Sequence, residues 1–210
     1  MRAPQLVLVH FPPCVSAPPG LPSPVVTTCS KNRTGCSADN CAALREQWAA
    51  METALSLGLI RAAGVSNYCK SCLEALREAH VKPAVNQVQL HVGMGPDPQG
   101  FVSTSRSQGM TLQAWSPLGH GGHGSGEILH GKLTTSIGRA HNKSAAQIAL
   151  KWILSKSIAV VTKSSNPEHL RENLALFDFA LSDAEMSALD AASFSSEDTP
   201  SFMCDDTPPY

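Results

Sequence analysis

The chain has 210 residues, carries a formal net charge of −1, and is 42% hydrophobic and 16% charged. The sequence contains no basic block, so its charge pattern argues against a nucleic-acid partner. No apolar stretch approaches the roughly 18 residues of a transmembrane helix, so a membrane partner is not expected either.

The first half of the chain alternates strand-like and helix-like patterns. A short apolar run at 6–9 predicts a strand, and the Pro- and Ser-rich stretch 16–40 predicts a long loop inserted after it. Apolar residues recur every three or four positions over 42–57, with charged residues between them, which predicts an amphipathic helix. A second apolar run at 60–65 and a second helical pattern at 71–80 follow.

The second half continues this alternation. Apolar runs at 84–90, 110–115 and 158–161 predict three more strands. A helical pattern covers 144–154, and the spacing Ser182 to Glu185 is that of a capping box opening a further helix. The strand-like runs are too short for buried helices, so we expect strands buried on both faces.

Alternating strands and helices predict a parallel sheet with crossover helices, in the α/β class. Both an open doubly wound sheet and part of a (β/α)8 barrel satisfy this pattern. The barrel is favoured because polar and aromatic residues fall at the predicted carboxyl ends of the strands, where barrel enzymes carry their sites. These residues are His10, Ser66, Asn67, Gln87, Trp115 and Lys163.

The groups at the strand ends also have a common chemistry. Gly64-Val65-Ser66-Asn67-Tyr68, Asn86-Gln87, Trp115-Ser116-Pro117-Leu118-Gly119 and Thr162-Lys163-Ser164-Ser165 supply amides, hydroxyls, an aromatic face and a cation. A nicotinamide dinucleotide needs groups of each kind. Taken singly, a buried histidine, a core tryptophan or a surface lysine explains each residue equally well, whereas their joint occurrence favours a cofactor site.

Five motifs in order resemble the aldo-keto reductases, over about residues 6–192. The motifs are Leu8-Val9-His10-Phe11-Pro12, Gly64-Val65-Ser66-Asn67-Tyr68, Pro83-Ala84-Val85-Asn86-Gln87, Trp115-Ser116-Pro117-Leu118-Gly119 and Thr162-Lys163-Ser164. The resemblance implies an incomplete TIM (β/α)8 barrel. A full barrel needs about 250 residues, so about the last five strand-helix units are expected here, in residues 1–192, with 193–210 as a C-terminal tail.

The resemblance implies roles near the reacting carbonyl. His10 matches the histidine that orients and polarises the substrate carbonyl, and Phe11 matches an aromatic wall of the substrate pocket. Ser66, Asn67 and Gln87 match the residues that hydrogen-bond the nicotinamide carboxamide. These matches imply hydride transfer to a small-molecule carbonyl substrate.

The resemblance also implies residues for the rest of NADPH. Trp115 takes the position that stacks on the nicotinamide, and Ser116 and Leu118 would follow the pyrophosphate. Lys163 and Ser164 would reach the adenosine 2′-phosphate.

Three more residues match the adenosine end of the site. Glu172 and Asn173 match the pair that holds the adenine. His169 stands where many relatives have an arginine over the adenosine phosphate. Because a neutral histidine lacks a permanent charge, a reduced preference for NADPH over NADH is expected, with NADP still the expected cofactor.

The family's proton donor is a tyrosine tuned by a lysine and an aspartate, all on strands that precede the histidine motif. The two tyrosines here, Tyr68 and Tyr210, match neither its position nor its motif. Losing a general acid typically lowers the rate by about 10² to 10⁴-fold. Two alternatives follow: an N-terminally truncated form of a working reductase, or a non-catalytic NADP-binding or regulatory relative.

The chain has seven cysteines, an odd number, without a paired framework. Cys69 and Cys72 have redox spacing, but a chance pair at a helix start is the simpler reading. We therefore expect reduced thiols and a cytoplasmic location. The His- and Gly-rich segment 120–126 and His130 lack the spacing of metal ligands, so no metal is expected.

Overall fold

A computed structural model describes residues 3–12, 38–119 and 124–194, with the backbone alone described at 38–41 and 99. The chain divides into two compact units. Among the described residues, unit 1 comprises 3–12, 38–88 and 99–111, and unit 2 comprises 89–98, 112–119 and 124–194.

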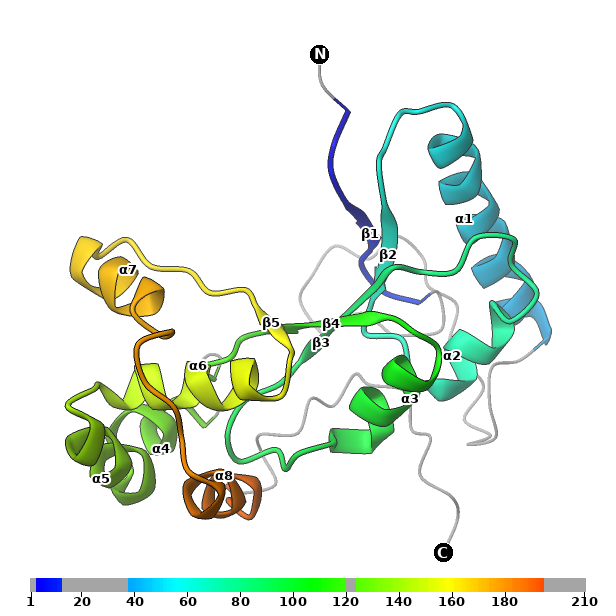
Figure 1. The fold of residues 1–210 in the computed structure, drawn as a ribbon. Coiled ribbons are helices and arrows are strands. Elements are labelled where there is room, and N and C mark those ends of the chain that lie inside the picture. Colours follow the sequence, from blue (N-terminus) through cyan, green and yellow to red (C-terminus); the bar gives the residue numbers. More distant parts are fainter. Residues whose placement is uncertain (1–2, 13–37, 120–123, 195–210) are drawn as a thin grey trace, which may run out of the picture. The chain divides into compact units, whose positions relative to one another are not determined.

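Unit 1 is built from parallel strands with helices between them (Figure 1). Strand β1 pairs with β2 in parallel, with Val7 opposite Ala63, and β2 pairs with β3, with Val65 opposite Asn86. Its elements are β1 (Val7–Val9), α1 (Ala38–Ser56), β2 (Ala63–Ser66), α2 (Lys70–Ala75), β3 (Val85–Gln89, the last residue in unit 2), the 3₁₀ turn η1 (Pro98–Gly100, beginning in unit 2) and α3 (Phe101–Ser107).

Strand β2 lies between close neighbours. All four of its residues are buried. A Cβ at Gly64 would come within 2.7 Å of both Leu8 Cδ2 and the Val85 carbonyl oxygen. Only glycine allows the flanking strands to approach this closely.

Helix α1 fixes the segment that leads into β3. Leu44 and Trp48 are buried at 0% and 2% exposure. The Trp48 indole N–H donates to the Val81 carbonyl oxygen over 2.7 Å, and the Val81 amide donates to Glu52 Oε1 over 2.8 Å. One helix thus satisfies both backbone groups of Val81, which orients the start of β3.

Unit 2 contains most of the helices. Strands β4 and β5 are parallel, with Gln113 opposite Ala159. Its elements are β4 (Thr111–Trp115, the first residue in unit 1), α4 (Ser125–His130), α5 (Lys132–His141), α6 (Ala145–Ser155), β5 (Ala159–Val160), α7 (Pro167–Leu174) and α8 (Asp183–Asp190).

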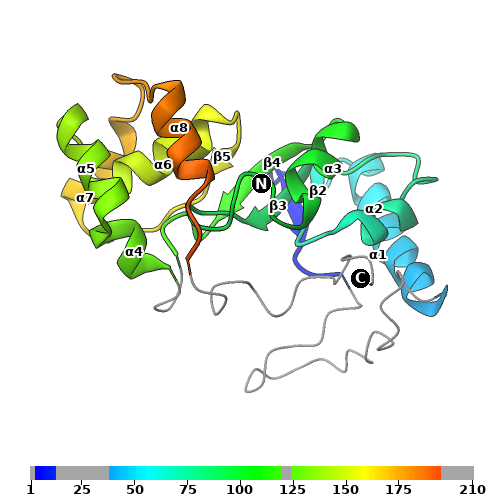
Figure 2. The ribbon, with the colours of Figure 1, turned by 90° about the horizontal axis from the view of Figure 1, so that it is seen from below.

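Helix α6 is the core helix of unit 2, and α4, α5, α6 and α8 pack together (Figure 2). Ile148, Leu150, Trp152 and Ile153 are all 0% exposed. Full burial of side chains of this size stabilises a fold by about 1.5 to 3 kcal/mol each, so α6 is the main apolar contribution in this unit.

The strands are hydrogen-bonded in chain order, β1-β2-β3-β4-β5. Between β3 and β4, the Thr111 amide donates to the Ala84 carbonyl oxygen within unit 1, over 2.9 Å. The Leu90 amide donates to the Trp115 carbonyl oxygen within unit 2, over 3.4 Å. The predicted parallel α/β arrangement is confirmed, and all five predicted strands are present. Full burial on both faces holds only for β2, because the other four strands contain half-buried or exposed residues.

The predicted helices are confirmed with some corrected boundaries. Helix α2 ends at Ala75, short of the predicted end at residue 80, because the Leu76 amide turns back to the Leu73 carbonyl oxygen. The predicted loop 16–40 is wrong at residues 38–40, which open α1, and its remainder lies outside the described residues. The predicted capping box at Ser182 is present.

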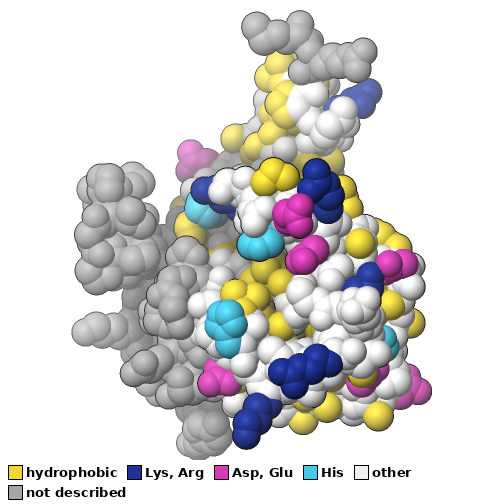
Figure 3. Space-filling view, turned by 90° about the vertical axis from the view of Figure 1, so that its left-hand side faces the viewer, with side chains coloured by type: hydrophobic (Ala, Val, Ile, Leu, Met, Phe, Trp, Pro, Cys, Tyr) yellow, Lys and Arg dark blue, Asp and Glu magenta, His cyan; other side chains and the backbone are white. Residues whose placement is uncertain are grey.

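The molecular face drawn in Figure 3 carries scattered charges. Its Lys and Arg, Asp and Glu, and His side chains are interspersed with uncharged surface rather than gathered in one block. This mixture agrees with the near-neutral net charge of −1. Within the part of the chain that is described, no helix is both long and apolar enough to cross a membrane.

Candidate functional site

The carboxyl end of β2 forms a buried polar turn in unit 1. Ser66 and Asn67 are each 1% exposed. The Ser66 hydroxyl and the Asn67 backbone N–H both donate to the Gln87 carbonyl oxygen, each over 2.9 Å. Asn67 has a left-handed backbone (φ 62°), a conformation that asparagine tolerates better than most residues. The turn therefore joins the end of β2 to Gln87 in the middle of β3, which corrects the expectation that Gln87 ends its strand.

The Asn67 side chain extends this cluster to β1. Its Nδ2 donates to the His10 carbonyl oxygen over 3.2 Å and to Ser66 Oγ over 3.0 Å. The His10 ring is exposed and lies 4.2 Å from the Phe11 ring, centroid to centroid. Unit 1 thus brings together all five residues predicted for the carbonyl and carboxamide: His10, Phe11, Ser66, Asn67 and Gln87.

Asn86 supports this turn, a role that sequence reasoning did not assign to it. The side chain is 0% exposed, and its Nδ2 donates to the Tyr68 carbonyl oxygen over 2.8 Å and to Ser105 Oγ over 3.2 Å. Its Oδ1 accepts from the Tyr68 amide over 3.4 Å. An asparagine inside a predicted buried strand was the available signal, because a buried amide requires partners.

The cysteines that follow the turn correct one expectation. Cys69 is disulfide-bonded, so the expectation of reduced thiols is wrong there. The sulfur atoms of Cys69 and Cys72 lie 3.5 Å apart, well beyond the roughly 2.05 Å of a disulfide bond. The cytoplasmic location stays a prediction.

In unit 2, the carboxyl end of β4 makes a tight turn. Ser116 has a left-handed backbone (φ 47°), and the Gly119 amide donates to its carbonyl oxygen over 3.0 Å. Trp115, Ser116 and Leu118 are half-buried, whereas Pro117 is buried. The three predicted residues Trp115, Ser116 and Leu118 thus lie on one turn. Residues 120–123 lie outside the described part, and His130 is the last residue of α4.

The segment after β5 leads into the amino terminus of α7. Lys163 is exposed and Ser164 is half-buried. Ser164 Oγ accepts a hydrogen bond from the Asn166 backbone N–H over 3.1 Å. The Asn166 side-chain oxygen caps α7 by accepting from the Glu168 backbone N–H over 2.9 Å. His169 is exposed on the first turns of this helix. A lysine beside a helix amino terminus is a suitable environment for a phosphate.

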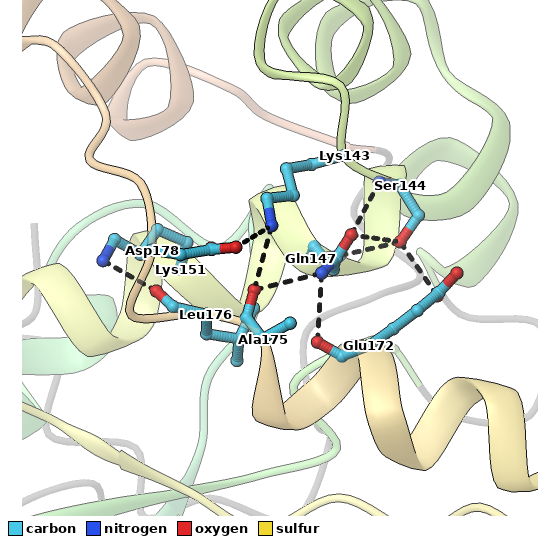
Figure 4. Close-up of polar contacts among 8 residues, drawn as sticks. All are labelled: Lys143, Ser144, Gln147, Lys151, Glu172, Ala175, Leu176 and Asp178. Carbon is cyan, nitrogen blue, oxygen red and sulfur yellow. Dashed lines mark hydrogen bonds and ion pairs between the residues drawn. The ribbon is translucent and has the colours of Figure 1, made fainter.

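The predicted adenine pair lies at the other end of α7, where both Glu172 and Asn173 are half-buried. Glu172 Oε2 accepts the Ser144 hydroxyl over 3.2 Å, and its backbone oxygen accepts Gln147 Nε2 over 3.0 Å (Figure 4). Sequence reasoning missed both contacts. The sequence does contain the spacing Ser144-x-x-Gln147, which is that of a capping box. This spacing indicates where α6 begins, but it does not indicate that both residues also contact Glu172.

Two carboxylates in unit 2 are held in their charged form. The Lys143 ammonium hydrogen-bonds Asp178 Oδ2 over 2.7 Å and lowers the pKa of that carboxyl. The pKa of Glu185 is also lowered, chiefly by the Ser182 backbone N–H and also by the Ser182 hydroxyl and His141. Each carboxylate thus joins a loop or helix end to a neighbouring element.

Among residues 3–12, 38–119 and 124–194, no group of three or more His, Cys, Asp and Glu side chains could hold a metal ion. The absence of a metal from the protein stays a prediction.

Comparison with known proteins gives the family. The profile described as "Aldo/keto reductase family" matches residues 2–193. The chain belongs to this family. The family resemblance expected from the five motifs is therefore confirmed.

Individual aldo/keto reductases match over part of their own length. Morphine 6-dehydrogenase of Pseudomonas putida is 39% identical over 156 residues, which cover 69% of this chain and 51% of that protein. Aldose reductase B of Dictyostelium discoideum is 32% identical over 189 residues, covering 89% of this chain and 58% of that protein. The chain thus spans between half and three fifths of the length of these two relatives.

A solved aldo/keto reductase shows the fold. The Bombyx mori enzyme in complex with NADP superposes with a TM-score of 0.71 at 22% identity, covering 99% of this chain and 64% of that one. The expected fold class, that of the TIM (β/α)8 barrel family, is confirmed. The described strands β1 to β5 supply five strands of that fold.

Proposed function

We propose that this chain carries the cofactor-binding part of an NADP(H)-dependent carbonyl reductase, which transfers hydride to an aldehyde or ketone. The observation that carries the proposal is the cluster at the ends of β1 and β2 and at Gln87 within β3. There the Asn67 side chain joins the His10 backbone to Ser66, and Ser66 and Asn67 both bond the Gln87 backbone.

The side chains of this cluster suit a nicotinamide carboxamide. A carboxamide offers two N–H donors and one carbonyl acceptor, and amide and hydroxyl side chains supply both complementary kinds. Asn67 and Gln87 are amides and Ser66 is a hydroxyl. The turn is fixed by two hydrogen bonds to the Gln87 carbonyl oxygen, one from the Ser66 hydroxyl and one from the Asn67 backbone N–H. Polar groups held in one geometry restrict which face of a bound ring is presented.

The adenosine end of NADP suits residues of unit 2. Lys163 supplies an exposed cation, Ser164 a hydroxyl, and α7 an amino terminus beside them. Glu172 and Asn173 would hold the adenine, and Trp115 would stack on the nicotinamide, with Ser116 and Leu118 along the pyrophosphate. Bound NADPH would supply the hydride.

His10 is proposed to orient the substrate carbonyl through its imidazole. Its ring is exposed at the end of β1 and lies against Phe11, so a small molecule can reach it beside an aromatic wall. A neutral imidazole can donate one hydrogen bond to a carbonyl oxygen. The proposed substrate is therefore a small carbonyl compound.

A non-catalytic NADP-binding relative is the second candidate. It is favoured by Tyr68, the one tyrosine among the described residues, which is 1% exposed and lies in the polar turn. Tyr68 belongs to the Ser66-Asn67-Tyr68 turn and matches neither the position nor the motif of the family's proton donor, which would supply the general acid. This candidate binds the cofactor without turning over a carbonyl.

One experiment separates the two candidates. The native protein, purified from its source cells, is mixed with NADPH and a panel of aldehydes and ketones, and NADPH oxidation is followed while NADPH binding is measured in parallel. Turnover that is lost in His10→Ala supports the reductase. Binding without turnover supports the second candidate, and the absence of both contradicts the two proposals. Cell fractionation of the same source tests the predicted cytoplasmic location.

A further inference from the structure

Helix α7 lacks the usual means of fixing a helix in place. It has eight residues, and none of its side chains is buried. A helix this short is marginal on its own in water and normally depends on packing of an apolar face. Its position must therefore come mainly from polar contacts. This matters because His169, Glu172 and Asn173 all lie on it.

The carboxyl end of α7 is held by side chains spaced four residues apart on α6 and just before it. Lys143, Gln147 and Lys151 follow this spacing, which places them on one face (Figure 4). They donate to backbone carbonyl oxygens at the end of α7 or just beyond it. The bonds are Gln147 Nε2 to Glu172 O (3.0 Å) and Ala175 O (3.2 Å), Lys143 Nζ to Ala175 O (3.3 Å), and Lys151 Nζ to Leu176 O (2.8 Å).

These bonds satisfy groups that a helix leaves unpaired. The last carbonyl groups of a helix have no partner within it and carry partial negative charge, so lysine ammonium groups are favourable there. Lys143 is well placed for this role, since its side chain is only 14% exposed and its ammonium also binds Asp178. The contact is therefore partly shielded from water, which strengthens it.

Ser144 adds a contact to a side chain of α7. Its hydroxyl donates to Glu172 Oε2 over 3.2 Å. As the cap of α6, the same hydroxyl oxygen accepts from the Gln147 backbone N–H. Lys143, Ser144, Gln147 and Lys151, here called the polar row, thus hold both the backbone and the carboxylate of the proposed adenine-binding residue Glu172.

We infer that the polar row positions α7 for the adenosine end of NADPH, with Ser144 and Gln147 as positioning residues that set cofactor affinity without touching the reacting carbonyl. This inference rests on the proposed function, because Glu172 is an adenine contact only if the chain binds NADP. It goes further by naming residues outside the cofactor site that control the site.

Ser144→Ala tests the inference, and the chain offers a matched control. Ser182 caps α8 through the same kind of capping box, but its partner Glu185 bonds His141 rather than a residue of α7. Both variants lose one cap hydroxyl, so we expect similar drops in melting temperature. Only Ser144→Ala should weaken cofactor binding, by about 3- to 10-fold in Kd, the usual effect of one hydrogen bond. Ser144→Thr keeps the hydroxyl and should restore affinity.

Comparing the affinities for adenosine 2′,5′-bisphosphate and for NADPH gives a readout that a general loss of stability would not produce. Adenosine 2′,5′-bisphosphate contains the adenosine end of NADPH without the nicotinamide. Its Kd and that of NADPH should rise by the same factor in Ser144→Ala. Gln147→Met removes one bond to α7 and one to Ala175 just beyond it, so it should give a larger rise in Kd. It should also give faster hydrogen exchange of the α7 amides, measured without ligand.

The outcomes separate this inference from the proposed function. If wild type binds both ligands but Ser144→Ala and Ser182→Ala bind them equally well, the inference is overturned and the proposed function stands. Unchanged α7 exchange in Gln147→Met overturns it in the same way. If wild type binds neither ligand, the proposed function fails and the inference fails with it, even where the exchange data show that the polar row holds α7.

Discussion

The side-chain amide of Asn67 donates to the backbone carbonyl oxygen of His10 over 3.2 Å, although 57 positions separate the two residues. Asn67 is one of the three proposed carboxamide-binding residues, and His10 is the proposed carbonyl-orienting residue. The bond fixes the backbone of His10 relative to the end of β2. A change at Asn67 should therefore affect both the proposed binding of the nicotinamide carboxamide and the geometry around His10.

Asn67→Ala should destabilise the protein by about 2 to 4 kcal/mol. The substitution removes the two hydrogen bonds that the Asn67 side chain donates. It also leaves an alanine, whose side chain cannot hydrogen-bond, in the left-handed conformation at φ 62°. Asn67→Gly removes the same bonds but tolerates this φ, so it should be about 1 kcal/mol less destabilising. Urea unfolding measures both, and equal losses would contradict the role of the backbone conformation.

His169→Arg should strengthen NADPH binding by about 5- to 20-fold. A guanidinium is permanently charged and can bind a phosphate through two parallel hydrogen bonds, which a neutral imidazole cannot. NADH, which lacks the 2′-phosphate, should change by less than about 2-fold. Leu170→Arg is the matched control, since Leu170 is the next residue and is 46% exposed. Titration of each variant with both nucleotides tests the prediction, and an equal gain in Leu170→Arg would indicate a general charge effect.

Asp190→Ala should cost about 2 to 4 kcal/mol of stability. Trp152 is 0% exposed, and its indole N–H donates to Asp190 Oδ1 over 2.7 Å. The same oxygen lies 2.7 Å from Lys156 Nζ. Without the carboxylate, a buried N–H loses its acceptor, and this is the expensive kind of hydrogen-bond loss. Asp190→Asn keeps an acceptor oxygen, so thermal unfolding should place it between wild type and Asp190→Ala.

Glu185 should make stability depend on pH in the acid range. Its pKa is lowered in the folded state, chiefly by the Ser182 backbone N–H. The folded state therefore favours the carboxylate. The resulting stabilisation is complete above the ordinary glutamate pKa of about 4.3 and is lost as the pH falls through the lowered folded-state pKa.

Urea unfolding of wild type and Glu185→Gln over a pH series measures this contribution. Wild type should be the more stable above about pH 5, and the difference should shrink as the pH falls below about 4. A difference that stays constant over this range would show that the carboxylate charge is not the source of the stabilisation.

The strands and the unit 1 cluster could be predicted from the sequence because their signals are local. Each strand is a short apolar run, and the polar residues of β2 and β3 follow or end such a run. Parallel strands place their carboxyl ends at one edge, so sequence position indicates that residues ending neighbouring strands lie together. Gln87 meets Ser66 and Asn67 through strand register instead, since it lies in the middle of β3 opposite Ser66.

Helix α7 and its support could not be predicted in the same way. Its two leucines, Leu170 and Leu174, are 46% and 78% exposed, so it has no buried apolar face to produce a helical pattern. The bonds from Lys143 and Gln147 join residues 25 to 32 positions apart. Such contacts depend on tertiary packing, which no local pattern specifies.

The most direct test of the central claim is equilibrium binding of NADPH to the purified protein, with NADH and Lys163→Met compared in the same titration. We predict saturable NADPH binding that is tighter than NADH binding. The difference should shrink in Lys163→Met, because the variant loses the cation proposed to face the 2′-phosphate. Absence of NADPH binding, or equal affinities of wild type for the two nucleotides together with no effect of Lys163→Met, would contradict the account.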